Sequence, residues 1–185
     1  SYYKSIGGTF ALPLHKGYEE SLKAYLTEIV ERVQKYHIAF KHNLYMFEKA
    51  GQLTASSAGY ISMKKLYSTI GLNGINEAAM FLGIEVSYND DYKNFCRLVT
   101  GTISELNKKN STPDYQFNQE FVPAETLGSK NFNWDKKDGY VVPDDGRVLY
   151  NSYFYDAHND TSVLDKMRIA RSEEHRVGKE CRSRW

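Results

Sequence analysis

A long stretch of apolar residues at helical spacing constrains the fold of this chain more than any other feature. From Tyr18 to Ala50, apolar side chains recur every three or four residues, and charged side chains fill the positions between them. The apolar positions are Leu22, Leu26, Ile29, Val33, Tyr36, Phe40, Leu44 and Phe47. Gly51 supplies a stop signal. The pattern predicts one amphipathic helix whose apolar side packs against other elements, as in the outer layer of an α/β fold.

Three further helices are predicted along the chain. The first is entered through Asn73-Gly74 and has Glu77 in its first turn, where the helix dipole favours an acid. Asn89 caps the second, and Thr161 or Ser162 caps the third. The three ranges are 72–82, 90–109 and 163–169.

Extended segments are predicted between these helices. They are a strand and loop over residues 1–16, a short strand over 60–63, a strand that starts at Tyr115, and a strand over 149–155. Strands that alternate with helices of ten or more residues predict an α/β layer in which neighbouring strands are parallel.

The stretch from Phe117 to Tyr155 is the best candidate for a functional site. Pro123 breaks the extended backbone, and the small residues from Ala124 to Gly128 let a loop approach a ligand closely. Turn signals at 138–139 and 144–146 then lead into the second extended run. The expected unit is a strand, a polar loop and a strand, which forms either the wall and rim of a site or a plain scaffold.

Composition and charge exclude several classes of protein. Hydrophobic residues make up 41% of the chain, which is enough for a packed core, and the net charge of +1 gives no electrostatic footprint for nucleic acid. No apolar run approaches the length of a membrane span, and the start of the chain does not resemble a signal peptide. A cytoplasmic protein is therefore expected, with no membrane partner.

The last fifteen residues differ from everything before them. Residues 171–185, RSEEHRVGKECRSRW, lack apolar periodicity and closely resemble translated sequencing adapter. We expect residues 1–170 to be the protein and 171–185 to be a non-native tail; the alternative is a natural basic tail.

The cysteines and histidines do not predict a metal site. Cys181 lies in this tail, which leaves Cys96, expected to be a buried inert thiol beside the apolar face of its helix. His37 and His42 are five residues apart and do not share a helix face.

Several motifs occur in the order found in one enzyme family. They are SIGGTFALPL at Ser5–Leu14, YSTIGLNGINEAAMFLGI at Tyr67–Ile84, FVPAETLG at Phe121–Gly128, and the WDKKDGYVVP and LYNSYF segments that follow. Together they resemble the barrel domain of anaerobic (class III, glycyl-radical) ribonucleoside-triphosphate reductases. The resemblance covers most of residues 5–168 and implies part of a ten-stranded α/β barrel.

The resemblance also implies a chemistry. Enzymes of that family convert ribonucleoside triphosphates to deoxyribonucleoside triphosphates. A glycyl radical, installed by an iron–sulfur activase that uses S-adenosylmethionine, passes to a cysteine, and the resulting thiyl abstracts the ribose 3′ hydrogen. The family further implies a structural zinc, allosteric nucleotides, a reductant that is either formate or a thioredoxin-like protein, and a homodimer.

Individual residues inherit expected roles from this resemblance. Glu125 matches a glutamate that accepts the 3′-OH proton or carries protons to the 2′-OH; a plain acid at a helix N-terminus is the alternative. Backbone amides around Ala124 are expected to cradle phosphates. Ala11 replaces an asparagine that contacts substrate in formate-using members, which favours a redoxin as reductant. Asn151 and Ser152 are expected to stabilise the surroundings of their strand and not to touch substrate. The predicted substrate-contact positions are Gly7, Gly8, Ala11, Pro123, Ala124 and Thr126.

Parts of the family pattern fall outside the chain. In the family order, the thiyl cysteine would precede Ser1, and the glycyl loop and a four-cysteine zinc site would follow Ala170. The chain therefore resembles an internal fragment that holds no cofactor and is expected to be inactive alone. Two alternatives remain open: a non-enzymatic α/β interaction domain, and a glycyl-radical acyltransferase related to pyruvate formate-lyase.

Overall fold

The computed structural model describes residues 17–121, 123–155 and 162–169. Its elements are α2 (Tyr18–Lys49), α3 (Thr54–Ser57), the 3-10 helix η1 (Met63–Lys65), β1 (Tyr67–Leu72), α4 (Ile75–Phe81), α5 (Asp90–Asn110), β2 (Gln116–Phe121) and α6 (Glu125–Lys137). Residues 163–169 form a further helical segment. None of the helices described is long and apolar enough to cross a membrane.

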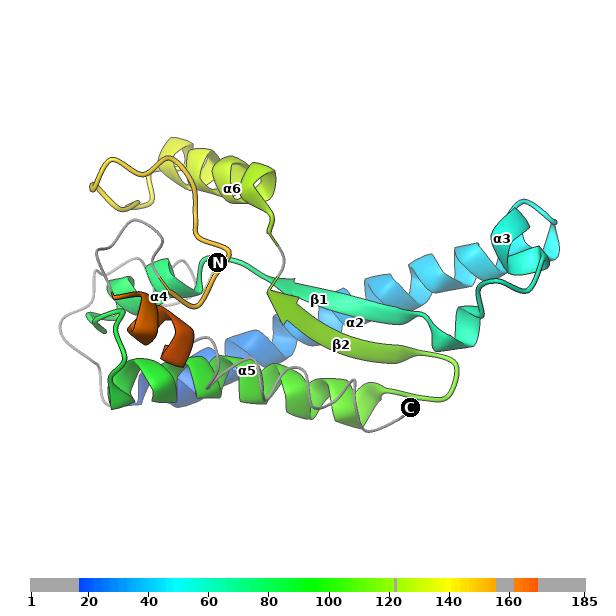
Figure 1. The fold of residues 1–185 in the computed structure, drawn as a ribbon, viewed down its shortest axis with the longest axis horizontal. Helices are drawn as coiled ribbons and strands as arrows, with labels where there is room; N and C mark the ends of the chain where they lie inside the picture. The colour runs from blue at the N-terminus through cyan, green and yellow to red at the C-terminus, as the bar shows by residue number, and fades with distance from the viewer. Residues whose placement is uncertain (1–16, 122, 156–161, 170–185) are drawn as a thin grey trace.

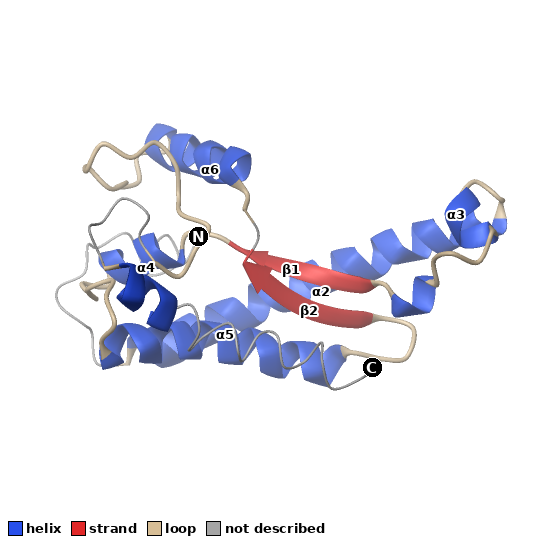
Figure 2. Ribbon diagram, viewed as in Figure 1, coloured by secondary structure: helices blue, strands red, loops and turns tan. Residues whose placement is uncertain are grey.

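The two strands form a parallel pair. They run in register from Tyr67 opposite Gln116 to Leu72 opposite Phe121, and α5 belongs to the crossover between them. Helices α2 and α5 lie along one side of the pair, and both arrowheads point toward the end of the molecule that holds α4 and α6 (Figures 1 and 2). The predicted α/β layer with parallel neighbours is confirmed in these two strands.

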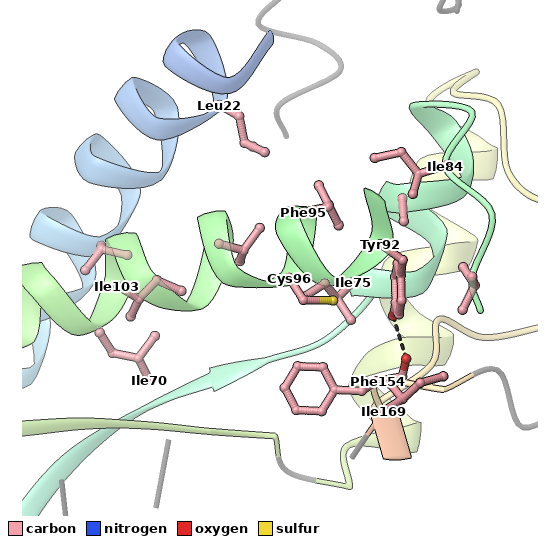
Figure 3. Packing of buried hydrophobic residues seen from close by; sticks show 14 of the residues in the cluster. Leu22, Ile70, Ile75, Ile84, Tyr92, Phe95, Cys96, Ile103, Phe154 and Ile169 are labelled. Carbon is pink, nitrogen blue, oxygen red and sulfur yellow. Dashed lines mark hydrogen bonds between the residues drawn. The ribbon is translucent and has the colours of Figure 1, made fainter. Parts of the chain in front are cut away.

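The core lies between the two long helices, α4 and the strands. Helix α5 contributes four of its most buried members, because Tyr92, Phe95, Cys96 and Ile103 are each at most 2% exposed (Figure 3). Asn89 Oδ1 accepts a hydrogen bond from Tyr92 N at 2.7 Å, so the predicted cap of this helix is confirmed. The prediction of a buried Cys96 is also confirmed.

Helix α2 has the predicted bounds, but only its first half buries the predicted face. Leu22 is buried and Leu26 and Val33 pack against the core, whereas Tyr36 and Phe40 remain 69% and 62% exposed; Val30, which was not predicted, is also buried. The helix instead turns polar side chains inward at two positions. Gln34 bonds Asn107 and Asn110 of α5 at 2.8 and 2.7 Å, and Lys41 donates to the Leu66 carbonyl at 2.9 Å. Specific amide and amine contacts therefore decide the orientation of this half.

Three local predictions were wrong. Residues 60–62 form no strand and residues 63–65 form η1, so the strand in this region is β1, starting at Tyr67. The expected loop after Pro123 is the start of α6. Residues 149–155 form no strand, because their backbone groups bond to other segments: Asn151 N donates to a side-chain carboxylate, and Asn151 O accepts from Gly74 N.

The other predicted helices are present. The helix predicted over 72–82 starts later than expected, because Leu72 ends β1 and α4 begins at Ile75 after Gly74, which lies in the left-handed region at φ 79°. Ser162 Oγ accepts from Asp165 N at 3.2 Å at the start of the helical segment 163–169. Thr161 lies outside the described residues.

Candidate functional site

Three segments that are far apart in the sequence meet beyond the carboxyl ends of the two strands. Asn73 to Glu77 follows β1, Pro123 to Gly128 follows β2, and Tyr150 to Phe154 returns to them from the loop after α6. The edge formed by carboxyl ends of parallel strands is where ligands bind in open α/β sheets and in α/β barrels. The arrangement therefore marks this edge as the candidate site.

Ser152 connects all three segments through one hydroxyl group. Its Oγ accepts a hydrogen bond from Asn73 Nδ2 at 2.9 Å and another from Ala124 N at 3.2 Å. The residue is 4% exposed, so these bonds are shielded from competing water. Ser152 thus fixes the distance between the turn after β1 and the turn that opens α6.

Gly128 lets the returning loop approach α6 closely. A Cβ atom at this position would lie 2.6 Å from the Tyr150 carbonyl oxygen, which is closer than real Cβ contacts occur. Tyr150 N donates to Gly128 O at 3.4 Å from the same side. A side chain at position 128 would therefore push the loop away from the helix.

A buried ion pair anchors the returning loop to α4. Arg147 Nη1 lies 2.6 Å from Glu77 Oε1, and both side chains are 2% exposed. The same oxygen accepts from Asn151 N at 3.0 Å, while Arg147 Nε and Nη2 bond the Asp145 carboxylate. Glu77 was predicted only as an acid that interacts with the helix dipole. No local pattern in the sequence links it to a residue 70 positions away.

Two ionisable groups of this network have shifted pKa values. The hydrogen bonds from Arg147 lower the pKa of Asp145 below its usual value. Burial raises the pKa of Tyr150, and its 2.6 Å hydrogen bond to Asp135 raises it further. Asp145 therefore stays charged and Tyr150 stays a phenol across the physiological range.

The first turn of α6 faces outward from this support. Pro123, Glu125, Thr126 and Leu127 are exposed, and α6 has no capping side chain within the described part of the chain. The first N–H groups of a helix lack intrahelical partners and carry partial positive charge. The turn can therefore receive an anionic group such as a phosphate.

Comparisons with known proteins decide the family. A family model described as anaerobic ribonucleoside-triphosphate reductase matches residues 11–177. The chain belongs to this family. No curated protein matches it.

Solved structures of the family share the fold. An anaerobic ribonucleotide reductase from Thermotoga maritima in complex with dATP and CTP is 22% identical, with a TM-score of 0.78 over 88% of this chain and 28% of that one. The same enzyme with citrate in the active site gives 22% identity and 0.76, over 86% and 30%. A further structure of an anaerobic ribonucleotide reductase gives 23% identity and a TM-score of 0.73, over 86% of this chain and 26% of that one. The chain spans less than a third of each.

The family assignment clarifies which predicted residues the structure brings together. Pro123, Ala124, Glu125 and Thr126 lie side by side at the start of α6, with Ser152 beneath them as a supporting residue. The predicted positions Gly7, Gly8 and Ala11 lie outside the described residues. The sequence interpretation placed Asn73 and Glu77 only at a helix start and did not predict their contacts or those of Arg147.

No group of three or more potential metal ligands occurs among the residues that the structure describes.

Proposed function

We propose that this chain forms part of the catalytic barrel of an anaerobic ribonucleoside-triphosphate reductase and that its α6 N-terminus contacts the substrate. The amides of residues 125–127 bind phosphate oxygens, with Pro123, Ala124 and Thr126 beside them, and the Ala124 amide itself donates to Ser152 Oγ. Gly7, Gly8 and Ala11 contribute to the same site. The observation that carries the proposal is the hydroxyl of Ser152, which joins three family-like segments at the carboxyl edge of two parallel strands.

In this proposal Glu125 handles protons at the ribose. It is the first residue of α6 and is exposed, so its carboxylate is available to a bound substrate. A carboxylate there accepts the 3′-OH proton or carries a proton to the departing 2′-OH. The first turn of α6 positions the nucleotide so that this carboxylate lies within reach of the ribose.

The glycyl radical and the structural zinc are assigned to other parts of the whole enzyme. When present, the radical supplies the hydrogen abstraction that starts reduction. The one cysteine that the structure describes, Cys96, is 1% exposed within the core and does not fit the role of a radical cysteine. The described residues therefore bind and orient the substrate and move protons, and the isolated chain makes no deoxynucleotide.

The remaining features of the proposal follow the family. The whole enzyme is a cytoplasmic homodimer with a ten-stranded barrel, an activase partner and allosteric nucleotides. Ala11 favours a thioredoxin-like reductant over formate. Residues 171–185 are a non-native tail, which genomic sequencing across this end tests directly. Neither the interaction domain nor the acyltransferase is favoured, because the family model matches a reductase.

Glu125→Gln in the reductase polypeptide that contains this segment tests the proposal. Loss of a proton-transfer group is expected to lower deoxynucleotide formation about 10²- to 10⁴-fold, with little change in the affinity for substrate. Glu105→Gln, at an exposed glutamate of α5, is the matched control and should retain full activity. If Glu125 is only an acid at a helix N-terminus, the variant loses about 0.3–1 kcal/mol of stability and keeps its rate.

A further inference from the structure

We propose that Glu77 is a positioning residue that holds the N-terminus of α6 in its phosphate-binding geometry. The inference rests on the proposed function and extends it to a residue that touches no substrate. The buried Glu77–Arg147 pair has no role in the substrate contacts proposed above, and this inference assigns it one.

A series of contacts, here called the relay, links Glu77 to α6. It starts at a single carboxylate oxygen of Glu77. Glu77 Oε1 accepts from Arg147 Nη1 at 2.6 Å and from Asn151 N at 3.0 Å, so one atom fixes both the side chain and the backbone of the returning loop. Gly74 N also donates to Asn151 O at 2.8 Å. Both backbone polar groups of Asn151 are thereby held, its N–H by Glu77 of α4 and its carbonyl by Gly74 of the turn before α4.

The relay continues into α6 through the neighbouring residue. Because Asn151 is fixed, Ser152 Oγ lies where it accepts from Ala124 N, the amide just before the helix. The close contact between Gly128 and Tyr150 holds the other side of the first turn. A shift of the loop therefore moves the amides that face the ligand.

Stability alone does not account for this pair. Glu77 Oε2 is buried and has no hydrogen-bond partner in the described part of the chain, which makes the pair costly. Apolar residues often replace a buried ion pair with no loss of stability. The charged pair fixes the orientation of the loop, and an apolar pair of similar volume would not.

A double-mutant cycle on the 185-residue chain tests the inference, with inorganic tripolyphosphate as the probe in calorimetric titrations. Glu77→Gln is expected to weaken binding about tenfold and Ser152→Ala about fivefold. The double variant should be no weaker than Glu77→Gln, because both act through the same amides. Gln34→Met, which removes a buried amide between α2 and α5, is the matched control and should bind as the wild type does.

A loss of about fiftyfold in the affinity of the double variant, as expected for two independent effects, would overturn the inference. So would a folded Glu77→Gln protein that binds tripolyphosphate as tightly as the wild type. Should that variant not fold, Arg147→Lys is used instead and is expected to weaken binding in the same non-additive way.

Hydrogen exchange separates this inference from the proposed function. If the wild type binds no tripolyphosphate, phosphate binding by α6 is refuted. The exchange rate of the Ala124 amide then shows whether Glu77 still positions the start of α6. About tenfold faster exchange in Glu77→Gln, with the α5 amides unchanged, supports it. Unchanged exchange at Ala124 refutes it.

Discussion

Gly128→Ala is expected to destabilise the protein, although alanine is the better helix former. Alanine gains about 1 kcal/mol over glycine within a helix. Its Cβ, however, would lie 2.6 Å from the Tyr150 carbonyl oxygen, about 0.8 Å inside the 3.4 Å at which ordinary contacts begin. The obstacle is backbone, not the flexible end of a side chain, so the loop or the helix must move.

The expected size of this effect follows from two costs and one gain. Overpacking costs about 1–3 kcal/mol. Displacing the loop also weakens the bond from Tyr150 N to Gly128 O, and a typical hydrogen bond contributes about 1 kcal/mol. Against the gain in helix propensity, a net loss of about 1–3 kcal/mol remains.

Gly101→Ala provides a matched control within α5. A Cβ atom there would meet nothing within 4 Å, and the backbone is helical. This variant is expected to gain about 0.5–1 kcal/mol. Urea unfolding followed by circular dichroism measures both. A Gly128→Ala protein as stable as Gly101→Ala would refute the close packing of α6 on the returning loop.

Three further substitutions test the Glu77–Arg147 pair, the Asp145–Arg147 pair and the hydrogen bond of the Tyr92 hydroxyl. Arg147→Met is expected to cost about 3–5 kcal/mol in urea unfolding, because it leaves Glu77 buried and unpaired; an unchanged midpoint would contradict this. The lowered pKa of Asp145 means that its stabilisation is complete above the usual pKa of about 4 and is lost as the pH falls through the lower folded value. Asp145→Asn should therefore flatten the acid limb of a stability–pH curve, and an identical limb would exclude the pairing. Tyr92→Phe is expected to cost about 1–3 kcal/mol, because the Tyr92 hydroxyl lies 2.5 Å from the Phe154 carbonyl oxygen; calorimetric unfolding measures the loss, and equal stability would contradict it.

Helices with strong periodicity or clear caps could be predicted from the sequence. α5 carries Asn89 at its start and a continuous apolar face, so its bounds and its burial both agree with the structure. The second half of α2 could not be predicted in the same way. Its orientation depends on Gln34 and Lys41 finding partners on other elements, which the pattern of one helix does not reveal.

The site was predictable in its location more than in its construction. Pro123 and the small residues after it marked a segment that the structure places beyond the carboxyl end of β2, but this segment forms a helix start where a loop was expected. The run from Leu149 to Tyr155 has the composition of a strand. Asn151 N nevertheless bonds to α4, and Ser152 Oγ bonds to the amide just before α6. This run therefore pairs with no strand.

We propose that the first turn of α6 binds the phosphates of a ribonucleoside triphosphate. Photolabelling tests it most directly, with a ribonucleoside triphosphate that carries an azidoanilide on its γ-phosphate and the reductase polypeptide that contains this segment. The label is predicted on the tryptic peptide Asn110–Lys130, within residues 123–127, and excess unlabelled substrate should prevent it. Competable labelling confined to other peptides would contradict the claim.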